Sequence, residues 1–409
     1  MNPYLIIGNG VAAAGCIEGI RSVDPDDAIT VVSAEKHPVY SRPLISYYLE
    51  GKTDLNRMQY RSEDFYETNC CTVIPGQAEE IDPVAGSVRL SDGTTLPYRK
   101  LCLATGSSPF VPPMAGLDGV RKKSCFMTVD DALLLESYVT KQSDALIIGA
   151  GLIGLKCAEG LRDRANSITV CDLADHVLSS ILDGDSAAIV QRHLEANGLR
   201  FRLGDSVRQF SGSVATLQSG ETIPFDVLVL AVGVRANTAL LRSIGGEVGR
   251  GIVVNARMET SIPDIFAAGD CTEGFEMTSG QNRVVAILPN AYRQGFAAGV
   301  NMAGGDAAFT KNIPMNSIGL FGLHIMTAGS YTGAPTEERT ETTLKRFYTD
   351  AGLLKGFILV GHTERAGIYT SLIREQTPLD TIDFEAMKKI ASTSYFSSDV
   401  RRKKFGGVV

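Results

Sequence analysis

Short apolar runs separated by glycine-rich turns recur along the chain. Residues 4–7 form the first run, a glycine turn follows, and residues up to about Arg21 have the apolar spacing of a helix. Residues 28–32 form a second, largely apolar run, which ends three residues before Glu35. Runs that are apolar throughout are typical of parallel strands buried on both faces. The order therefore predicts a strand, a tight turn, a helix and a second buried strand.

The turn after the first run has the spacing Gly-x-Gly-x-x-Ala. In this pattern Gly8 permits the tight turn, Gly10 lets the backbone approach a pyrophosphate, and Ala13 keeps the helix close to the strand. The helix N-terminus then offers N–H groups to the phosphates. Glu35, after the second strand, is placed to accept hydrogen bonds from a ribose. Glycine turns also serve plain packing, but the strand, turn, helix, strand and acid together predict a dinucleotide site.

Residues 144–172 repeat this architecture with a complete Gly-x-Gly-x-x-Gly motif. The motif consists of Gly149, Gly151 and Gly154, and Asp172 ends the strand that follows the helix. A carboxylate at that position binds the free 2′-hydroxyl of a ribose, whereas a 2′-phosphate needs a nearby arginine. The three residues after Asp172 are leucine, alanine and aspartate. The sequence therefore predicts a second dinucleotide site, which prefers NAD over NADP.

Three further apolar runs end in turns of small residues. Residues 101–106 end in Ala-Thr-Gly, residues 226–233 in Ala-Val-Gly, and residues 262–270 in Ala-Ala-Gly-Asp. Asp270 thus follows a buried strand at a glycine turn. There it either hydrogen-bonds the sugar-like hydroxyls of a cofactor or serves as an ordinary turn aspartate.

The remaining pattern predicts a covering loop, a helix and a last domain. Residues 37–51 are interrupted by two prolines, which is typical of a loop laid over the first site. Residues 289–304 predict a helix of small residues that packs closely against a neighbour. From about Lys311 the pattern changes to an α+β segment, with strands near residues 317–327, 343–348 and 354–361 and a helix over 366–375.

Composition narrows the class of protein. The chain has 409 residues, of which 44% are apolar and 21% charged, and this predicts a globular protein of two or three domains. The net charge of −7 argues against a nucleic-acid partner, and no apolar run is long enough to cross a membrane. Because the first strand begins at once, without a signal-like segment, we expect a cytoplasmic location. The basic runs 121–123 and 401–404 are interpreted as solvated surface, with docking of an acidic partner as the alternative.

The eight cysteines lack the spacing of a redox or metal site. None forms a Cys-x-x-Cys pair, and none has iron–sulfur or zinc spacing. We therefore interpret all eight as structural, with the neighbours Cys70 and Cys71 the least typical, and we expect no metal site.

Together, the motifs resemble in order and spacing those of the FAD-dependent pyridine-nucleotide oxidoreductases of the glutathione-reductase fold. The resemblance covers nearly the whole chain. It implies an α/β protein with two Rossmann-like domains, for FAD at residues 1–110 and 238–310 and for NAD at 111–237, plus a C-terminal α+β interface domain at 311–409. It also implies FAD at the first site, with Asp270 on the ribityl chain, and NAD(H) at the second. The expected cofactor-binding residues are Gly8, Gly10, Ala13, Glu35, Arg42, Pro43, Ala104, Thr105, Gly106, Gly149, Gly151, Ile153, Gly154, Asp172, Gly233, Gly269 and Asp270.

The segment Tyr40–Ser46, which reads Tyr-Ser-Arg-Pro-Leu-Ile-Ser, distinguishes the branch of the family. Disulfide reductases have a cysteine pair here, and flavin NADH oxidases or peroxidases have one cysteine at the position of Arg42, so a thiol relay is excluded. The segment resembles that of rubredoxin and ferredoxin reductases and of the flavin part of nitrite reductases. Those relatives commonly pair a lysine after the serine with a glutamate near the NAD motif, where this chain has Tyr47 and Lys156. We hypothesise that Lys156 lies near flavin N5 and stabilises the reduced flavin, unless Glu159 pairs with it on the same helix.

The resemblance implies hydride transfer between NADH and the flavin, followed by single-electron steps to a metal-centred carrier. The main hypothesis is an NADH oxidoreductase that transfers electrons between NAD(H) and an iron–sulfur carrier such as rubredoxin or ferredoxin, without a redox disulfide. The first alternative is the NAD(H)-facing FAD subunit of a larger complex, of the tungsten aldehyde oxidoreductase or phenylglyoxylate dehydrogenase type. The second alternative is an NADH-sensing flavoprotein. Because the chain has no iron–sulfur cysteines, both enzyme hypotheses require a redox partner protein, and the first alternative implies a hetero-oligomer.

Overall fold

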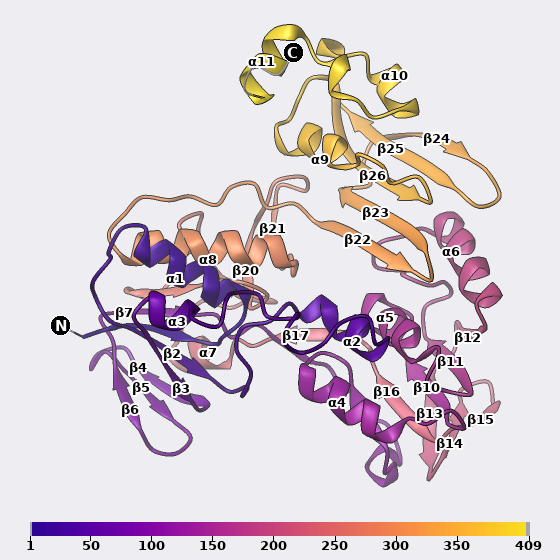
Figure 1. The fold of residues 1–409 in the computed structure, drawn as a ribbon, viewed down its shortest axis with the longest axis horizontal. Helices are drawn as coiled ribbons and strands as arrows, with labels where there is room; N and C mark the ends of the chain where they lie inside the picture. The colour runs from indigo at the N-terminus through magenta and orange to yellow at the C-terminus, as the bar shows by residue number, and fades with distance from the viewer. Residues whose placement is uncertain (1, 406–409) are drawn as a thin grey trace. The chain divides into compact units, whose positions relative to one another are not determined.

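The computed structural model describes residues 2–405 (Figure 1). The chain divides into two compact units. Residues 1–112, 124–138 and 232–312 form the first unit, and residues 113–123, 139–231 and 313–409 form the second. The boundaries of the three domains expected from the sequence stay a prediction.

A five-stranded sheet forms the centre of the first unit. Its strand order is β19-β7-β1-β2-β3, and each neighbouring pair is parallel. All four residues of β1 are buried, because a parallel sheet covered on both faces exposes neither side of its strands. The strands are β1 Tyr4–Ile7, β2 Ile29–Ser33, β3 Cys71–Pro75, β7 Lys100–Leu103 and β19 Ile265–Ala267.

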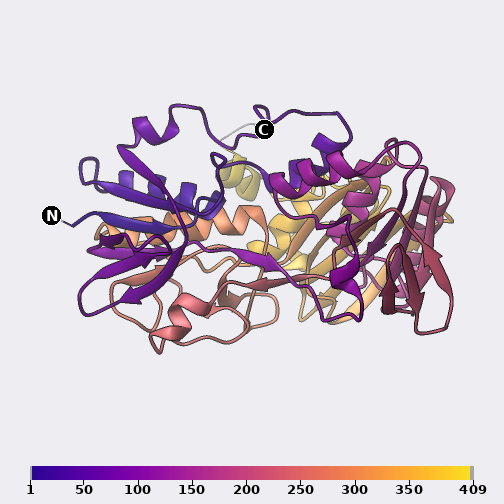
Figure 2. The same ribbon diagram turned by 90° about the horizontal axis from the view of Figure 1, so that it is seen from below.

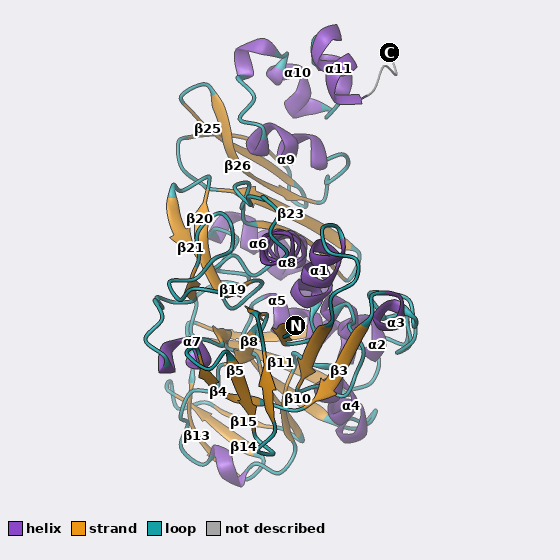
Figure 3. Ribbon diagram, turned by 90° about the vertical axis from the view of Figure 1, so that its left-hand side faces the viewer, coloured by secondary structure: helices purple, strands orange, loops and turns teal. Residues whose placement is uncertain are grey.

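Two helices, α1 (Val11–Arg21) and α8 (Leu288–Met302), lie side by side in this unit (Figures 1 and 3). In Figure 2, α8 is the orange helix that runs behind the indigo strands of the sheet. A Cβ atom on Gly295 of α8 would lie 1.9 Å from the Ala12 carbonyl oxygen of α1, so only glycine fits at this contact. The closely packed helix of small residues expected at 289–304 is therefore confirmed, and its neighbour is α1.

Smaller elements complete the first unit. The turn over residues 91–94 joins β5 to β6 in an antiparallel three-stranded sheet, of order β4-β5-β6. The additional strands are β4 Ala78–Asp82, β5 Ser87–Leu90, β6 Thr95–Pro97, β8 Ser107–Pro109, β17 Val234–Ala236, β18 Ile252–Val253, β20 Thr272–Glu276 and β21 Gln281–Arg283. The additional helices are η1 Arg42–Leu44, α2 Ile45–Leu49, α3 Phe65–Thr68, α4 Val129–Tyr138 and α7 Ala239–Ser243.

The second unit repeats the strand, turn and helix of the first. Its central sheet has the order β12-β11-β10-β16-β9, and the pairs among β12, β11, β10 and β16 are parallel. The strands, with those of a small antiparallel sheet, are β9 Lys123–Cys125, β10 Asp144–Ile148, β11 Ser167–Asp172, β12 Leu199–Leu203, β13 Val207–Ser211, β14 Val214–Leu217, β15 Thr222–Pro224 and β16 Val227–Leu230. The helices are η2 Leu117–Gly119, α5 Leu152–Leu161 and α6 Gly184–Ala196.

The C-terminal part of the second unit is an antiparallel sheet of order β22-β23-β26-β25-β24, on which α9 packs. The strands and helix expected from the sequence are present, but β24 was missed because all six of its residues are exposed and it has no apolar run. The elements are β22 Met315–Leu320, β23 Leu323–Gly329, β24 Ala334–Arg339, β25 Leu344–Asp350, β26 Leu353–Val360, α9 Gly367–Arg374, η3 Leu379–Thr381, α10 Phe384–Lys389, η4 Thr393–Tyr395 and α11 Ser398–Phe405.

An ion-pair network joins this sheet to α6. The Arg346 side chain on β25 is only 10% exposed and contacts the carboxylates of Asp183 and Glu337, the latter at 2.6 Å. Asp183 is also the N-cap of α6, where its Oδ1 accepts a hydrogen bond from the Ser186 backbone N–H at 2.9 Å. One carboxylate thus caps a helix and binds the strand beside it.

Candidate functional site

The first unit contains a cavity of about 310 Å³, lined by residues that follow β1, β2, β7 and β19. Parallel α/β sheets bind ligands at the carboxyl ends of their strands. Ala13 does not line the cavity but is fully buried in α1, as its predicted packing role requires. Ten of the predicted residues line it, namely Gly8, Gly10, Glu35, Arg42, Pro43, Ala104, Thr105, Gly106, Gly269 and Asp270.

The glycine turn directs the N-terminus of α1 to this cavity. Gly8 has a φ of +108°, and a Cβ atom on it would lie 2.2 Å from the Ala104 carbonyl oxygen, so a larger residue does not fit. Gly10 is the N-cap of α1, and apart from its two chain neighbours no residue has an atom within 4 Å of where its Cβ would be. The open side of Gly10 lets a ligand approach the backbone. The N–H groups of the first helical turn suit an anionic phosphate there.

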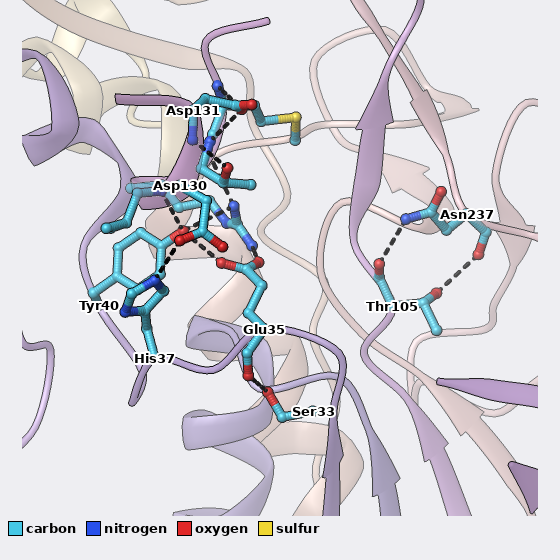
Figure 4. A network of polar contacts seen from close by, with 12 residues as sticks. Ser33, Glu35, His37, Tyr40, Thr105, Asp130, Asp131 and Asn237 are labelled. Carbon is cyan, nitrogen blue, oxygen red and sulfur yellow. Dashed lines mark hydrogen bonds and ion pairs between the residues drawn. The ribbon is translucent and has the colours of Figure 1, made fainter. Parts of the chain in front are cut away.

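Three side chains form a hydrogen-bonded group on the wall of the cavity (Figure 4). The Arg42 guanidinium contacts the Glu35 carboxylate through Nη2 and donates to the Met127 carbonyl oxygen through Nη1 at 3.1 Å. The Tyr40 hydroxyl donates to Glu35 Oε2 at 2.7 Å and accepts from the Val129 backbone N–H at 3.2 Å. Both carboxylate oxygens of Glu35 are therefore engaged by protein donors, with lone pairs left for a ribose hydroxyl.

Asp270 lies in the turn after β19 and lines the same cavity. The Gly269 backbone N–H donates to the Gln294 side-chain oxygen at 2.9 Å, so a buried residue of α8 holds this turn. Burial raises the pKa of the Asp270 carboxyl, and the positive charge of Arg42 partly offsets that rise. A buried carboxyl at the cavity suits the hydroxyls of a sugar-like chain, but the assignment of Asp270 to the ribityl chain stays a prediction.

A reciprocal pair of hydrogen bonds holds the turn that contains Thr105. Thr105 Oγ1 donates to the Asn237 carbonyl oxygen at 2.8 Å, and Asn237 Nδ2 donates to the Thr105 carbonyl oxygen at 2.9 Å (Figure 4). Gly233 precedes β17 and accepts a hydrogen bond from the Phe110 backbone N–H at 2.9 Å. Gly233 is not among the residues that line the cavity, and its role in cofactor binding stays a prediction.

The second glycine loop has the same local geometry in the second unit. Gly149 has a φ of +117°, Gly151 is the N-cap of α5, and a Cβ atom on Gly154 would lie 1.9 Å from the Gly149 carbonyl oxygen. Asp172 ends β11, where its Oδ2 accepts from the Ala150 backbone N–H at 2.6 Å. The carboxylate expected to bind a ribose is therefore held against the glycine loop. Ile153 lies in the first turn of α5, partly exposed.

Lys156 of α5 contacts Glu159 of the same helix, and its Nζ also donates to the Gly319 carbonyl oxygen at 3.3 Å. Glu159 Oε1 accepts from the Phe321 backbone N–H at 2.6 Å. The pair is thus bonded to the end of β22 and to the turn that joins β22 to β23. The pairing with Glu159 that was the alternative for Lys156 is present. The proposed role of Lys156 near the flavin stays a prediction.

All eight cysteines are free thiols. Cys271 is the neighbour of Asp270, but its Sγ donates to the Leu103 carbonyl oxygen at 3.3 Å, and burial raises its pKa to about 11. Burial also raises the pKa of Cys71 to about 12. Neither thiol is an activated nucleophile at neutral pH, because reactive cysteines need a lowered pKa.

Among residues 2–405, no group of three or more His, Cys, Asp and Glu side chains is arranged to hold a metal ion. None of the described helices combines the length and apolar character that a membrane crossing requires.

Sequence reasoning missed several residues of the site. The motif that contains Tyr40 was recognised, but the hydrogen bond from Tyr40 to Glu35 was not predicted. Met127 also lines the cavity and comes from a segment with no cofactor motif. Gln294 could have been noticed in the sequence, because it is a polar residue within a helix of small residues. In the structure it is only 3% exposed. A buried polar side chain needs a hydrogen-bond partner, which here is the turn at Gly269.

Residues 2–295 match the family model described as pyridine nucleotide-disulphide oxidoreductase. The chain is 32% identical over 391 residues to the epsilon subunit of NADH-dependent phenylglyoxylate dehydrogenase from Aromatoleum evansii, covering 92% of each protein. It is 28% identical over 326 residues to NADH-rubredoxin oxidoreductase from Clostridium acetobutylicum, covering 80% of this chain and 81% of that protein. It spans only 49% and 44% of two longer Bacillus subtilis relatives, an assimilatory nitrate reductase electron transfer subunit and a nitrite reductase.

Among solved structures, the putidaredoxin reductase–putidaredoxin complex has a similar chain, with a TM-score of 0.87 and 22% identity over 96% of both chains. That likeness shows a shared fold. The α/β fold class with two Rossmann-like units and a C-terminal α+β part is confirmed, as is the family resemblance. The chain belongs to the pyridine nucleotide-disulphide oxidoreductase family.

Proposed function

We propose that this chain is an FAD-dependent NADH oxidoreductase that passes electrons between NAD(H) and a one-electron iron–sulfur carrier protein, such as rubredoxin or ferredoxin, without a redox disulfide. The observation that carries the proposal is Arg42. At the position where flavin NADH oxidases and peroxidases have a cysteine, this chain has the Arg42 guanidinium, which is bonded to Glu35 and to the Met127 carbonyl oxygen. None of the described residues that line the cavity is a cysteine. The proposed compartment is the cytoplasm, where NADH is produced and consumed.

The residues around the cavity fit FAD. The N-terminus of α1 offers N–H groups to a pyrophosphate beside Gly10, and Glu35 is placed for the adenosine ribose. Asp270 and the turn at Thr105 offer polar groups to the ribityl and isoalloxazine portion. When bound, FAD supplies the exchange between two-electron and one-electron chemistry, so the side chains bind and orient rather than act as acid, base or nucleophile.

The second glycine loop fits NADH better than NADPH. Asp172 presents a carboxylate at the end of β11, and no cation follows it in the next three residues. Leu173, the residue that follows Asp172 in the sequence, is 75% exposed. A 2′-phosphate would therefore meet a negative charge and an apolar side chain where it needs a cation.

A second proposal is that the chain is the NAD(H)-facing subunit of a larger oxidoreductase. The observation that favours it is the similarity to the phenylglyoxylate dehydrogenase epsilon subunit, which extends over 92% of both proteins. In either role the chain needs a redox partner protein. The two proposals differ in whether that partner is a diffusing carrier or a permanently bound subunit.

Anaerobic stopped-flow reduction of the purified flavoprotein by NADH and NADPH, followed by mixing with oxidised rubredoxin or ferredoxin, tests the proposal. Fast reduction by NADH alone and rapid reoxidation by a carrier are expected for a free-standing reductase. Fast reduction without reoxidation by either carrier would favour the subunit, and co-purification of a larger protein would then be expected. Slow reduction by both nucleotides would refute electron transfer and favour the NADH-sensing alternative.

A further inference from the structure

We propose that Tyr40 is a positioning residue for the adenosine half of the bound flavin and that it acts through Glu35 and Arg42. The proposal rests on the proposed function, because it takes FAD as the occupant of the cavity. Tyr40, Glu35 and Arg42 all line that cavity. Glu35 is the side chain placed for the adenosine ribose, so a residue that holds Glu35 controls that contact.

The Tyr40 hydroxyl is fully used by the protein. It donates to Glu35 Oε2 at 2.7 Å, and it accepts from the Val129 backbone N–H and from Arg42 Nη1, each at 3.2 Å. A phenol has one O–H and two lone pairs, so these three partners use its whole capacity. Tyr40 is only 8% exposed, and its burial raises the pKa of the hydroxyl, which keeps the proton that it donates to Glu35.

These contacts join the loop after β2 to the start of α4. Val129 is the first residue of α4, and His37 Nε2 lies 2.9 Å from Asp130 Oδ1 in the next position (Figure 4). The His37–Asp130 contact is more exposed than the Tyr40 hydroxyl, because the Asp130 side chain is 66% exposed. Tyr40 is therefore the buried link between Glu35 and the helix. Without the Tyr40 hydroxyl, Glu35 keeps its contact with Arg42 but loses the second of the two contacts that limit rotation of its carboxylate.

A second trio of the same chemistry lies in the same unit and provides a comparison. The Tyr292 hydroxyl donates to the Glu18 carboxylate, and Arg61 Nε donates to Glu18 Oε1 at 2.6 Å. None of these three side chains lines the cavity. The two trios thus share a phenol, a carboxylate and a guanidinium, and they differ in whether the carboxylate faces the proposed cofactor.

A comparison of FAD with FMN can distinguish a residue that positions the adenosine half of the flavin from a residue that only stabilises the fold. FMN has the isoalloxazine and ribityl phosphate of FAD but lacks the adenosine half, so it makes no contact with Glu35. Loss of the Tyr40 hydroxyl should release Glu35 and so remove its hydrogen bond to the ribose. FAD binding should then weaken about tenfold, as expected for one hydrogen bond to a charged group, and FMN binding should stay nearly unchanged. A merely structural role would weaken both flavins to the same extent.

The test equilibrates the flavoprotein with equal concentrations of FAD and FMN, removes unbound flavin, and measures the ratio of the two bound flavins by chromatography. In Tyr40→Phe the ratio of bound FAD to bound FMN should fall about tenfold relative to the original protein. Tyr292→Phe is the matched control and should keep the original ratio. An unchanged ratio in Tyr40→Phe, or an equal fall in Tyr292→Phe, would overturn the inference.

A second variant covers the case in which Tyr40→Phe does not fold. Glu35→Gln should lower the same ratio, because Tyr40 acts through the Glu35 carboxylate. Where both variants fold, the double variant should be no worse than the more affected single variant, and additive losses would contradict a shared action. If the original protein retains neither flavin, the proposed function and this inference both fail. If it retains FAD and the ratio does not respond to Tyr40, only this inference fails.

Discussion

Replacing Asp172 by asparagine tests how the second glycine loop selects its nucleotide. Asp172 Oδ2 accepts the Ala150 backbone N–H at 2.6 Å, and Oδ1 accepts the Ala174 backbone N–H at 2.8 Å. Asparagine has the same shape but one acceptor oxygen, so its NH₂ group would face one of these two donors. The substitution removes a hydrogen bond to a charged acceptor and also removes the negative charge from the end of β11.

The expected magnitude combines two effects on the nucleotide preference. A hydrogen bond from the NADH ribose to a carboxylate is worth about 1.5 kcal/mol more than to a weak or misplaced acceptor. Relief of the repulsion between Asp172 and a 2′-phosphate adds about 1 kcal/mol, the value for unit charges about 4 Å apart in a wet site, as the exposure of Leu173 indicates. Damage to the loop itself weakens both nucleotides equally. The preference for NADH over NADPH should therefore fall by between about tenfold and a hundredfold.

The assay is the dependence of the anaerobic reduction rate on NADH and NADPH concentration, which gives a Kd for each nucleotide. Asp144→Asn is the matched control, because Asp144 Oδ1 accepts from Asn166 and Ser167 side chains at the opposite end of the same two strands. That control should lower stability without changing the ratio of the two Kd values. An unchanged ratio in Asp172→Asn, or the same change in Asp144→Asn, would refute the reasoning.

Four further predictions concern packing, an ion pair, the pH dependence of stability and Lys156. Gly154→Ala should lower the free energy of unfolding, measured in urea, by about 1–3 kcal/mol and weaken NADH binding, because the added Cβ meets the Gly149 carbonyl oxygen. Gly184→Ala, whose added Cβ meets open space, should change neither stability nor NADH binding by that much. Arg346→Met should cost about 2 kcal/mol, because it removes the cation bound by Glu337 and by Asp183, which is only partly exposed. Arg339→Met, which loses an exposed pair, should cost less than about 1 kcal/mol. Burial raises the pKa of Asp183, but hydrogen bonds from Ser186 and the charge of Arg346 outweigh burial and lower the pKa overall. The stabilisation of the folded state by the Asp183 carboxylate should therefore be present above about pH 4 and decline below it. Asp183→Asn should lack that decline. Lys156→Met should lower the flavin midpoint potential if Lys156 acts at N5. An unchanged potential with reduced stability would confine Lys156 to its contact with the end of β22.

The glycine motifs and the acids after β2 and β11 could be predicted because their requirements are local. A positive φ at Gly8 and Gly149 depends on the turn that joins a strand to the next helix, and that turn is written in adjacent residues. The apolar runs on either side identify the strands, and the spacing to Glu35 and Asp172 follows from the length of one helix and one strand. The close packing of α8 could be predicted for the same reason, since its small residues all lie within one short stretch of the sequence.

Only the tertiary structure decided what these acids touch. The Tyr40 hydroxyl reaches Glu35 within one loop. The Met127 carbonyl and the first N–H of α4, which bind Arg42 and Tyr40, come from about ninety residues further along the chain. The sequence left Asp270 open between a turn residue and a ligand, and its place in the cavity depends on how β19 pairs with β7. Lys156 likewise contacts a strand, β22, more than a hundred and sixty residues away in the chain. Such contacts arise from the pairing of distant strands and helices, which short-range periodicity and spacing do not specify, whereas the backbone needs of a turn are met by the residues within it.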